Sequence, residues 1–359
     1  MAQTSLVIVA LPLDHATPGI VATSVELTRR MQAQTIVVHA LPSRRMENER
    51  GRQTRIDEAR AELEPHLAPL RAAGVAIRDV TIGVGEAAEV VVEAARRTAA
   101  DMIVTGGGRP ATVRRWVVGS VAEEVVRRAA VPVWVARGKP LADGGPILCP
   151  VDLSPESKEG VDAAIGMARL FRAPLSLLTV VSDEHRRGDM PKVQAQAREA
   201  LATLIAAYDT EGLDVSMNVT VGDPASEIVD AAEHAGLMVV ASRGYDPLVR
   251  EWLGPVTARA LRHSRCSILT IRHLAQGHAA RMAAVARIAD LYAEARALVI
   301  DGRREQALPL LESLAQQAPT NAAIQEAYAI ALDHVGREVE ASGRHALAEL
   351  LRERLPRIP

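Results

Sequence analysis

The chain contains the same sequence pattern twice. The segment VVGSVAEEVVRRAAVPVWVAR at 117–137 matches WLGPVTARALRHSRCSILTIR at 252–272, with an offset of 135 residues. Upstream, RRMQAQTIVVHA at 29–40 matches RLFRAPLSLLTV at 169–180, with an offset of 140 residues. The small change of offset is a difference in loop length, which proteins tolerate more readily than changes inside strands and helices. The chain therefore carries two copies of one folding unit.

Each copy alternates short runs of Val, Ile and Leu with longer Ala-rich stretches that carry charges on one face. The runs are typical of parallel strands buried on both faces, and the stretches between them are typical of crossover helices. In the second copy the strand-like runs are PILCPVD, PLSLLTV, LDVSMNVTV, LMVVAS and CSILTI, with helical segments after the first, third and fourth. This alternation predicts an α/β fold with a doubly wound, five-stranded parallel sheet in each of two domains, 1–140 and 145–273.

The third part of the chain, 280–359, is rich in Ala, Leu, Glu and Arg and contains no strand-like run. Its segment 288–321 reads as a helix, a turn at Gly302 and a second helix that ends before Pro319, and it resembles a tetratricopeptide repeat. One such repeat cannot bury its own apolar face. We therefore expect this helical segment to pack on the body of the protein, to self-associate, or to bind a protein partner.

Charge and composition argue against several classes of function. The formal net charge is −2, and the chain has one Phe, three Trp and four Tyr, so neither a basic surface nor an aromatic platform for nucleic acid is expected. No apolar stretch reaches the ~18 residues that a membrane span needs, and no charged region precedes the first apolar run. We expect a cytoplasmic protein that binds neither nucleic acid nor membranes.

Sequence motifs for catalysis and metal binding are also missing. There is no G-x-S-x-G elbow, no H-E-x-x-H and no G-K-[ST] loop. Cys149 and Cys266 lie in apolar runs and form no C-x-x-C pair, so buried thiols are expected. His263 and His273 flank Cys266 without a fourth ligand, which argues against zinc.

Three features of the second copy together resemble the universal stress protein family. They are ILCPVDLSPES at 147–157, VTVGDPASEIVDAAEHAGLMVVASRG at 219–244, and the nine residues that separate Gly244 from Gly254. The first copy repeats the pattern more loosely, with VTIGVGEAAEVVVEAARRTAADMIVTGGG and VGSVAEEVV. The resemblance thus extends over both copies, in tandem.

The resemblance implies an adenine-nucleotide site beyond the carboxyl ends of the strands. In the nucleotide-binding branch, an Asp after the first strand holds the adenosine. The phosphates lie in a loop of the form Gly, two residues, Gly, nine residues, Gly, then Ser or Thr. The second copy keeps the Asp but has Ala241 for the first glycine and Pro255 for the hydroxyl residue. We expect a weakened site for ATP or AMP, with no metal beyond a Mg²⁺ that accompanies ATP. Its expected residues are Pro150, Val151, Asp152, Val180, Val240, Ala241, Arg243, Gly244, Gly254 and Val256.

The site of the first copy has changed in a complementary way. It retains the first and last glycines and the hydroxyl residue of the loop, which are Gly106, Gly119 and Ser120. However, Arg109 stands at the second glycine position, and Pro12 stands where the family has the Asp. Nucleotide binding is therefore less expected here than in the second copy.

The resemblance implies a non-enzymatic regulator of stress survival, with the two copies packed as a pseudo-dimer through their last strands, VPVWVAR and CSILTIR. One hypothesis is a nucleotide-responsive switch, in which ligand bound beside Asp152 alters what the helical segment presents. Another is a scaffold with vestigial pockets that acts through protein contacts alone. A nucleotide hydrolase is a third and weaker reading, because neither a general base nor a metal pair is evident.

Overall fold

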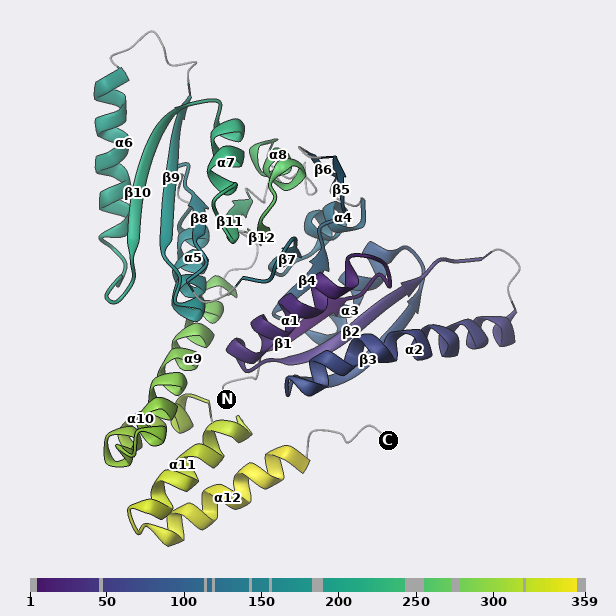
Figure 1. Ribbon diagram of the computed structural model, residues 1–359, viewed down its shortest axis with the longest axis vertical. Coiled ribbons are helices and arrows are strands. Elements are labelled where there is room, and N and C mark those ends of the chain that lie inside the picture. Colours follow the sequence, from purple (N-terminus) through teal and green to yellow (C-terminus); the bar gives the residue numbers. More distant parts are fainter. Residues whose placement is uncertain are drawn as a thin grey trace.

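The structure is a computed structural model of the 359-residue chain. It describes residues 5–44, 48–112, 115–117, 120–141, 144–154, 157–182, 190–242, 255–272, 278–318 and 321–353. Two α/β halves share one sheet, and a helical segment extends from their base (Figure 1).

Five parallel strands form the sheet of the first half, in the order β3-β2-β1-β4-β7. They are β1 (Leu6–Ala10), β2 (Gln34–Leu41), β3 (Ala76–Val84), β4 (Met102–Gly106) and β7 (Val133–Ala136). The helices are α1 (Thr17–Met31), α2 (Glu49–Ala72), α3 (Ala87–Thr98) and α4 (Ser120–Arg128). A short hairpin, β5 (Arg109–Thr112) with β6 (Arg115–Val117), was not expected from the sequence.

The second half has the same strand order, β10-β9-β8-β11-β12. Its strands are β8 (Ile147–Pro150), β9 (Leu175–Ser182), β10 (Val215–Gly222), β11 (Leu237–Ser242) and β12 (Ser267–Arg272). Its helices are α5 (Ser157–Phe171), α6 (Met190–Ile205), α7 (Pro224–Ala232) and α8 (Pro255–His263). These elements confirm the predicted α/β class and parallel sheets. Helix α6, after the second strand, had not been recognised in the sequence.

Backbone details show how closely the two halves correspond. Leu13 and Leu153 both have left-handed φ angles, of 56° and 59°, although neither is a glycine. His39 Nδ1 lies 2.7 Å from the carbonyl oxygen of Leu11, and Thr179 Oγ1 donates to the carbonyl oxygen of Val151 at 3.0 Å. Corresponding residues of the two halves, such as Leu13 and Leu153 or His39 and Thr179, are 140 residues apart, the offset of the upstream sequence match.

The two sheets join edge to edge. Strands β7 and β12 pair antiparallel, with Val135 opposite Ile268, so ten strands form one continuous sheet. One apolar core covers a face of this sheet with α1, α2, α5 and α6, and a second core covers the other face with α3, α4, α7 and α8. Trp134 of the first half meets Phe171 of the second, with ring centroids 5.9 Å apart. Each core contains residues of both halves, so both cores continue across the junction.

The C-terminal segment is helical, and its helices within residues 278–353 are α9 (His278–Ile300), α10 (Arg304–Gln317), α11 (Ala322–His334) and α12 (Glu338–Glu353). They enclose a separate core that includes Ala295, Leu311 and Leu332. Gly302 has a φ of 76°, a left-handed conformation that suits glycine at the turn between α9 and α10. Helix α9 packs against α5 and α1, so it joins the segment to both halves. Pro319 lies outside the described residues.

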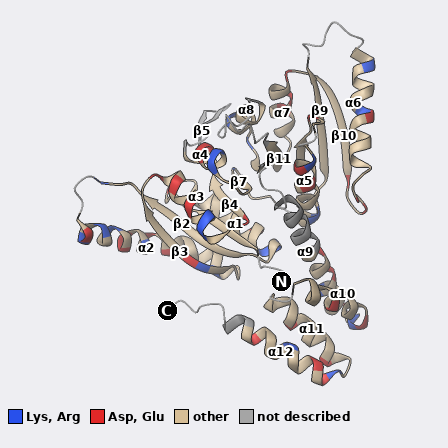
Figure 2. Ribbon diagram, turned by 180° about the vertical axis from the view of Figure 1, so that it is seen from behind, with Lys and Arg blue, Asp and Glu red and all other residues tan. Residues whose placement is uncertain are grey.

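Acidic and basic residues are interspersed over the helices (Figure 2). None of the helices in the described parts of the chain is long and apolar enough to cross a membrane.

Candidate functional site

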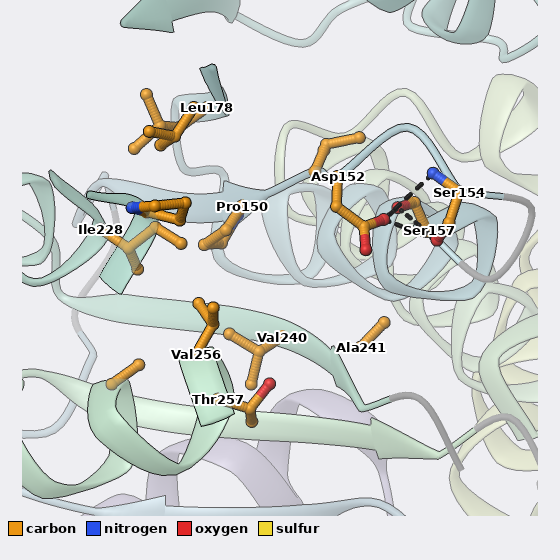
Figure 3. A pocket seen from close by; sticks show the side chains of 14 residues that line it. Pro150, Asp152, Ser154, Ser157, Leu178, Ile228, Val240, Ala241, Val256 and Thr257 are labelled. Carbon is orange, nitrogen blue, oxygen red and sulfur yellow. Dashed lines mark hydrogen bonds between the residues drawn. The ribbon is translucent and has the colours of Figure 1, made fainter. Parts of the chain in front are cut away.

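A cavity of about 380 Å³ opens beyond the carboxyl ends of the strands in the second half (Figure 3). Strand order reverses here, because β8 is followed in sequence by its neighbour on one side, β9, while β11 lies on its other side. Connections from the two central strands leave toward opposite faces and open a crevice between them, which is where doubly wound sheets bind ligands. The cavity is lined by Pro150, Val151, Asp152, Ser154, Ser157, Leu178, Val180, Pro224, Ile228, Val240, Ala241, Val256, Thr257 and Ala260.

The structure brings together seven of the residues expected from the sequence, namely Pro150, Val151, Asp152, Val180, Val240, Ala241 and Val256. Arg243, Gly244 and Gly254 lie outside the described residues, as does Gly119 of the first half. Ser120 and Pro255 are the first residues of α4 and α8, respectively.

Asp152 supplies the carboxylate of the cavity. Its Oδ1 atom accepts hydrogen bonds from the backbone N–H of Ser154 at 3.0 Å, from the Ser154 hydroxyl at 2.5 Å and from the Ser157 hydroxyl. Figure 3 shows the carboxylate turned toward these two serines. The left-handed backbone of Leu153 lets the chain turn sharply enough for Asp152 and Ser154 to meet. Asp152 is thus held in one orientation at the end of β8, with α5 beginning beside it.

The remaining walls are largely apolar. Leu178 and Val180 come from β9, Val240 from β11, Ile228 from α7 and Val256 from α8. Residues two apart in a strand face the same side of the sheet, so Leu178 and Val180 line the same wall. An apolar slot with few polar groups, and a fixed carboxylate at one end, suits a ligand with a flat apolar ring system and hydroxyl groups.

Ala241, where the family has glycine, lies in regular strand backbone. Its φ is not in the left-handed region, so glycine is not needed there for conformational reasons. Instead the neighbouring helix α5 has a glycine opposite Ala241, because a Cβ on Gly160 would lie only 3.2 Å from the Ala241 Cβ. The first half has the opposite arrangement, since a Cβ on Gly106 would lie 3.0 Å from Ile20 Cδ1. The glycine of this contact is therefore on the strand in the first half (Gly106) and on the helix in the second half (Gly160).

The first half lacks the carboxylate. Pro12 follows β1 at the position that corresponds to Asp152, and Asp14 corresponds to Ser154 instead. Asp14 Oδ1 accepts from the backbone N–H of Ala16 at 2.7 Å, and the Asp14 N–H donates to Thr17 Oγ1 at 3.0 Å. This aspartate organises the start of α1.

Seven residues of the cavity wall were not in the expected set, and they are Ser154, Ser157, Leu178, Pro224, Ile228, Thr257 and Ala260. A signal existed for two of them. Pro224 and Ile228 are four residues apart on α7, so they share one face of that helix. The two serines act through Asp152, and only the turn after β8 brings them to it.

An ion pair links α7 to α8 at the rim. Asp223 caps α7 by accepting from the Ser226 N–H at 3.0 Å, and it also accepts from Arg259 Nη1 at 2.8 Å. The hydrogen bonds from Ser226, together with the Arg259 charge, lower the pKa of Asp223. The two helices that wall the cavity are therefore joined beside it.

A residue of the first half contacts the carboxyl end of α8. Arg137, which follows β7 and is 3% exposed, donates to the carbonyl oxygens of Leu261 and Ser264 at the carboxyl end of α8. Burial lowers the pKa of Arg137 to about 10, so it remains charged near neutral pH. A cation at this end of a helix satisfies unpaired carbonyls and opposes the helix dipole. One wall of the cavity thus depends on the other half.

The two cysteines are buried and free, as expected. Burial raises the pKa of Cys149 to about 12 and that of Cys266 to about 11, which keeps both protonated at neutral pH. Among the described residues, no group of three His, Cys, Asp or Glu side chains is placed to hold a metal ion.

Known proteins resemble this chain in both sequence and fold. Relatives include a universal stress protein of Mycobacterium tuberculosis, 31% identical over 183 residues, which are 48% of this chain and 62% of that protein. The match therefore spans less than two thirds of the relative. A universal stress protein structure from Archaeoglobus fulgidus aligns over 75% of this chain and 99% of its own, with a TM-score of 0.61 and 17% identity. A structure from Pseudomonas aeruginosa aligns over 80% of this chain and 98% of its own, with a TM-score of 0.59 and 14% identity.

The two halves of the chain also match a single family separately. Residues 6–137 and 145–272 each match the universal stress protein family, and these ranges coincide with the two halves of the ten-stranded sheet. The chain therefore belongs to the universal stress protein family, as a tandem member with a C-terminal helical segment.

Proposed function

We propose that the cavity of the second half binds the adenosine part of an adenine nucleotide, and that the protein acts as a non-enzymatic, nucleotide-responsive regulator. The observation that carries this proposal is the position of Asp152, fixed by Ser154 and Ser157 at the mouth of an apolar cavity. A carboxylate there can accept hydrogen bonds from ribose hydroxyls, while the apolar walls contact the base.

Universal stress proteins have been solved in complex with cAMP and with dAMP. They align with 36% and 37% of this chain, each with a TM-score of 0.30. We therefore base the proposal on the cavity itself. Its volume of about 380 Å³ falls within the ~300–1,000 Å³ of small-molecule sites.

The proposed site is weaker than one with a complete phosphate loop. Pro255 provides neither the N–H nor the hydroxyl that Ser120 provides at the start of α4. The proline still starts a helix well, so the positive end of the α8 dipole is retained. Val256 and Thr257, in the first turn of α8, line the cavity and offer a backbone N–H and a hydroxyl.

Helix α5 gives the site a physical connection to the helical segment. Ser157 at its first turn holds Asp152, and its outer surface packs against α9. Loss or gain of a ligand at Asp152 changes the contacts at one end of this helix. We propose that α5 is the element through which nucleotide alters the presentation of α9–α12 to a protein partner.

Isothermal titration calorimetry with ATP and AMP tests the binding proposal. Asp152→Ala should weaken binding by about 1–3 kcal/mol, the cost of losing charge-assisted hydrogen bonds. The matched control is Asp14→Ala in the first half, which removes a hydrogen-bonded carboxylate from the corresponding loop and should leave the affinity unchanged. Absence of heat with the unmodified protein at millimolar nucleotide would contradict the proposal.

A scaffold that binds no nucleotide is the second candidate. The observation that favours it is that Asp152 Oδ1 already accepts three hydrogen bonds from the protein itself. Mass spectrometry of the denatured, purified protein distinguishes the two candidates. Co-purified adenine nucleotide supports the switch, whereas an empty protein that also gives no heat with nucleotide supports the scaffold.

A further inference from the structure

A second cavity, of about 480 Å³, lies where the three parts of the chain meet. Its walls come from the end of α1 in the first half, the end of α5 in the second half, and α9 of the helical segment. We call it the neck cavity. It is separate from the cavity beside Asp152, with which it shares no lining residue.

Arginines dominate the charge of the neck cavity. Arg29, Arg30, Arg172 and Arg296 line it, against two carboxylates, Glu26 and Asp290. The local excess of two positive charges stands out in a chain whose net charge is −2. Like charges that converge on one cavity repel one another, and an anion placed between them removes that repulsion.

The protein satisfies only part of this positive charge. Arg30 donates to Glu26 at 3.3 Å and to the carbonyl oxygen of Leu170 at 3.1 Å. By contrast, Arg29, Arg172 and Arg296 make no side-chain hydrogen bond or salt bridge to another residue in the described parts of the chain. Many other exposed arginines do have such partners, for example Arg96 with Glu93, Arg262 with Glu123 and Arg337 with Glu340.

Asp290 offsets only one of the four positive charges of the cluster. Burial raises the pKa of this carboxyl, although the nearby Arg172, Arg169 and Arg30 act in the opposite direction. Neither Arg169, which pairs with Asp209, nor Arg172 lies within salt-bridge distance of Asp290 in the described parts of the chain. Helix C-termini do favour cations, which accounts for the arginines at the ends of α1 and α5. It does not account for Arg296, which reaches the same cavity from α9.

We propose that the neck cavity binds a small phosphate-bearing anion and thereby fixes α9 against the two halves. Guanidinium groups match phosphate oxygens through paired, charge-assisted hydrogen bonds, and three of them converge here from three different helix regions. Leu170, Tyr292 and Ala293 provide an apolar side for the organic part of the ligand. Walls on several helices favour a small molecule over an extended polymer. A ligand that bridges Arg172 and Arg296 joins α5 to α9 directly.

Calorimetric titration with sodium tripolyphosphate at low salt tests this site in the full-length protein. The double substitution Arg172→Gln/Arg296→Gln should weaken binding by about tenfold for each arginine removed. The matched control is Arg60→Gln/Arg97→Gln, which removes the same charge from exposed positions on α2 and α3 and should change the affinity by less than twofold. Equal weakening in the two double variants, or no binding to the unmodified protein at millimolar concentration, would overturn the proposal.

Two further measurements separate the neck cavity from the site beside Asp152. Ile228→Trp fills the latter and should leave tripolyphosphate binding intact, so loss of binding in this variant places the anion in the other cavity and overturns the assignment. Hydrogen exchange of backbone amides in 288–300 should slow when tripolyphosphate binds. Unchanged exchange there overturns the claim that the anion fixes α9. Neither result depends on whether adenine nucleotide binds.

Discussion

Arg137 of the first half donates a hydrogen bond of 2.6 Å to the carbonyl oxygen of Ser264 in the second half. Arg137 directly follows β7, so the contact lies at the end of the β7–β12 junction, and the same guanidinium also donates to the Leu261 carbonyl. Because α8 both receives these bonds and walls the cavity beside Asp152, the junction and the candidate site share one helix. The first half therefore directly contacts a helix that walls the candidate site of the second half.

Arg137→Met should lower the free energy of unfolding by about 2–4 kcal/mol, because two buried carbonyls lose their partner. Urea denaturation measures this change. Arg262→Met is the control, since Arg262 also crosses the junction, to Glu123, but its side chain is 55% exposed. That exposed pair should contribute less than ~1 kcal/mol. Similar losses in the two variants would mean that Arg137 is no more important than a surface ion pair.

The close contact between Gly160 and Ala241 predicts that the effects of Gly160→Ile and Ala241→Gly on stability are coupled. Gly160→Ile copies the first half, where Ile20 occupies this position, and should destabilise the protein by about 1–3 kcal/mol through overpacking against Ala241. Adding Ala241→Gly supplies the partner that Gly106 provides in the first half and should recover ~1 kcal/mol or more. A thermodynamic cycle from denaturation curves of the four proteins measures the coupling. Purely additive effects would show that the two residues do not constrain each other.

Pro255→Ser should strengthen ATP binding about tenfold or more, because it restores an N–H and a hydroxyl at the start of α8. AMP should gain much less, because we expect the distal phosphates to lie at this turn. Ala241→Gly is the control and should give no gain, since the φ of Ala241 is not left-handed. Calorimetry with both nucleotides provides the measurement. Equal gains for ATP and AMP would show that this turn does not contact the distal phosphates.

The helical segment should show a pH dependence that is centred on His345. Hydrogen bonds from His345 to Asp333 at 2.9 Å and to Glu326 at 3.2 Å raise its pKa. A raised pKa in the folded state means that the stabilisation is fully present below the ordinary pKa of histidine, ~6.5, and is lost as the pH rises through the folded value. Since the side chain is 36% exposed, the effect should stay below ~1 kcal/mol.

Thermal melts of the unmodified protein and of His345→Asn, compared from pH 5 to pH 8, measure this contribution. The difference in melting temperature should be largest at low pH and should shrink as the pH rises. His334, whose Nδ1 lies 2.7 Å from the Ile330 carbonyl, provides the control through His334→Asn. A difference that does not vary with pH would mean that His345 contributes to packing and not through its charge.

Much of this protein was determined by its sequence alone. The two repeats, with strands rich in Val, Ile and Leu, predicted an α/β fold with a five-stranded parallel sheet in each half. Periodicity carries this information because it reports which face of each local element is buried. Asp152 and the apolar residues at the ends of β8, β9 and β11 could be anticipated from the family resemblance, which implies a ligand site where parallel strands present their carboxyl ends at one edge.

Tertiary structure decided the features that depend on residues distant in sequence. Gly160 lies opposite Ala241, Arg137 lies beneath α8, and the neck arginines converge from α1, α5 and α9. The serines that hold Asp152 depend on a left-handed turn at Leu153, a leucine that no turn preference singles out. Local propensity cannot reveal these contacts, because each is fixed by the packing of whole elements. Periodicity indicates which face of an element is buried, but not which elements become neighbours.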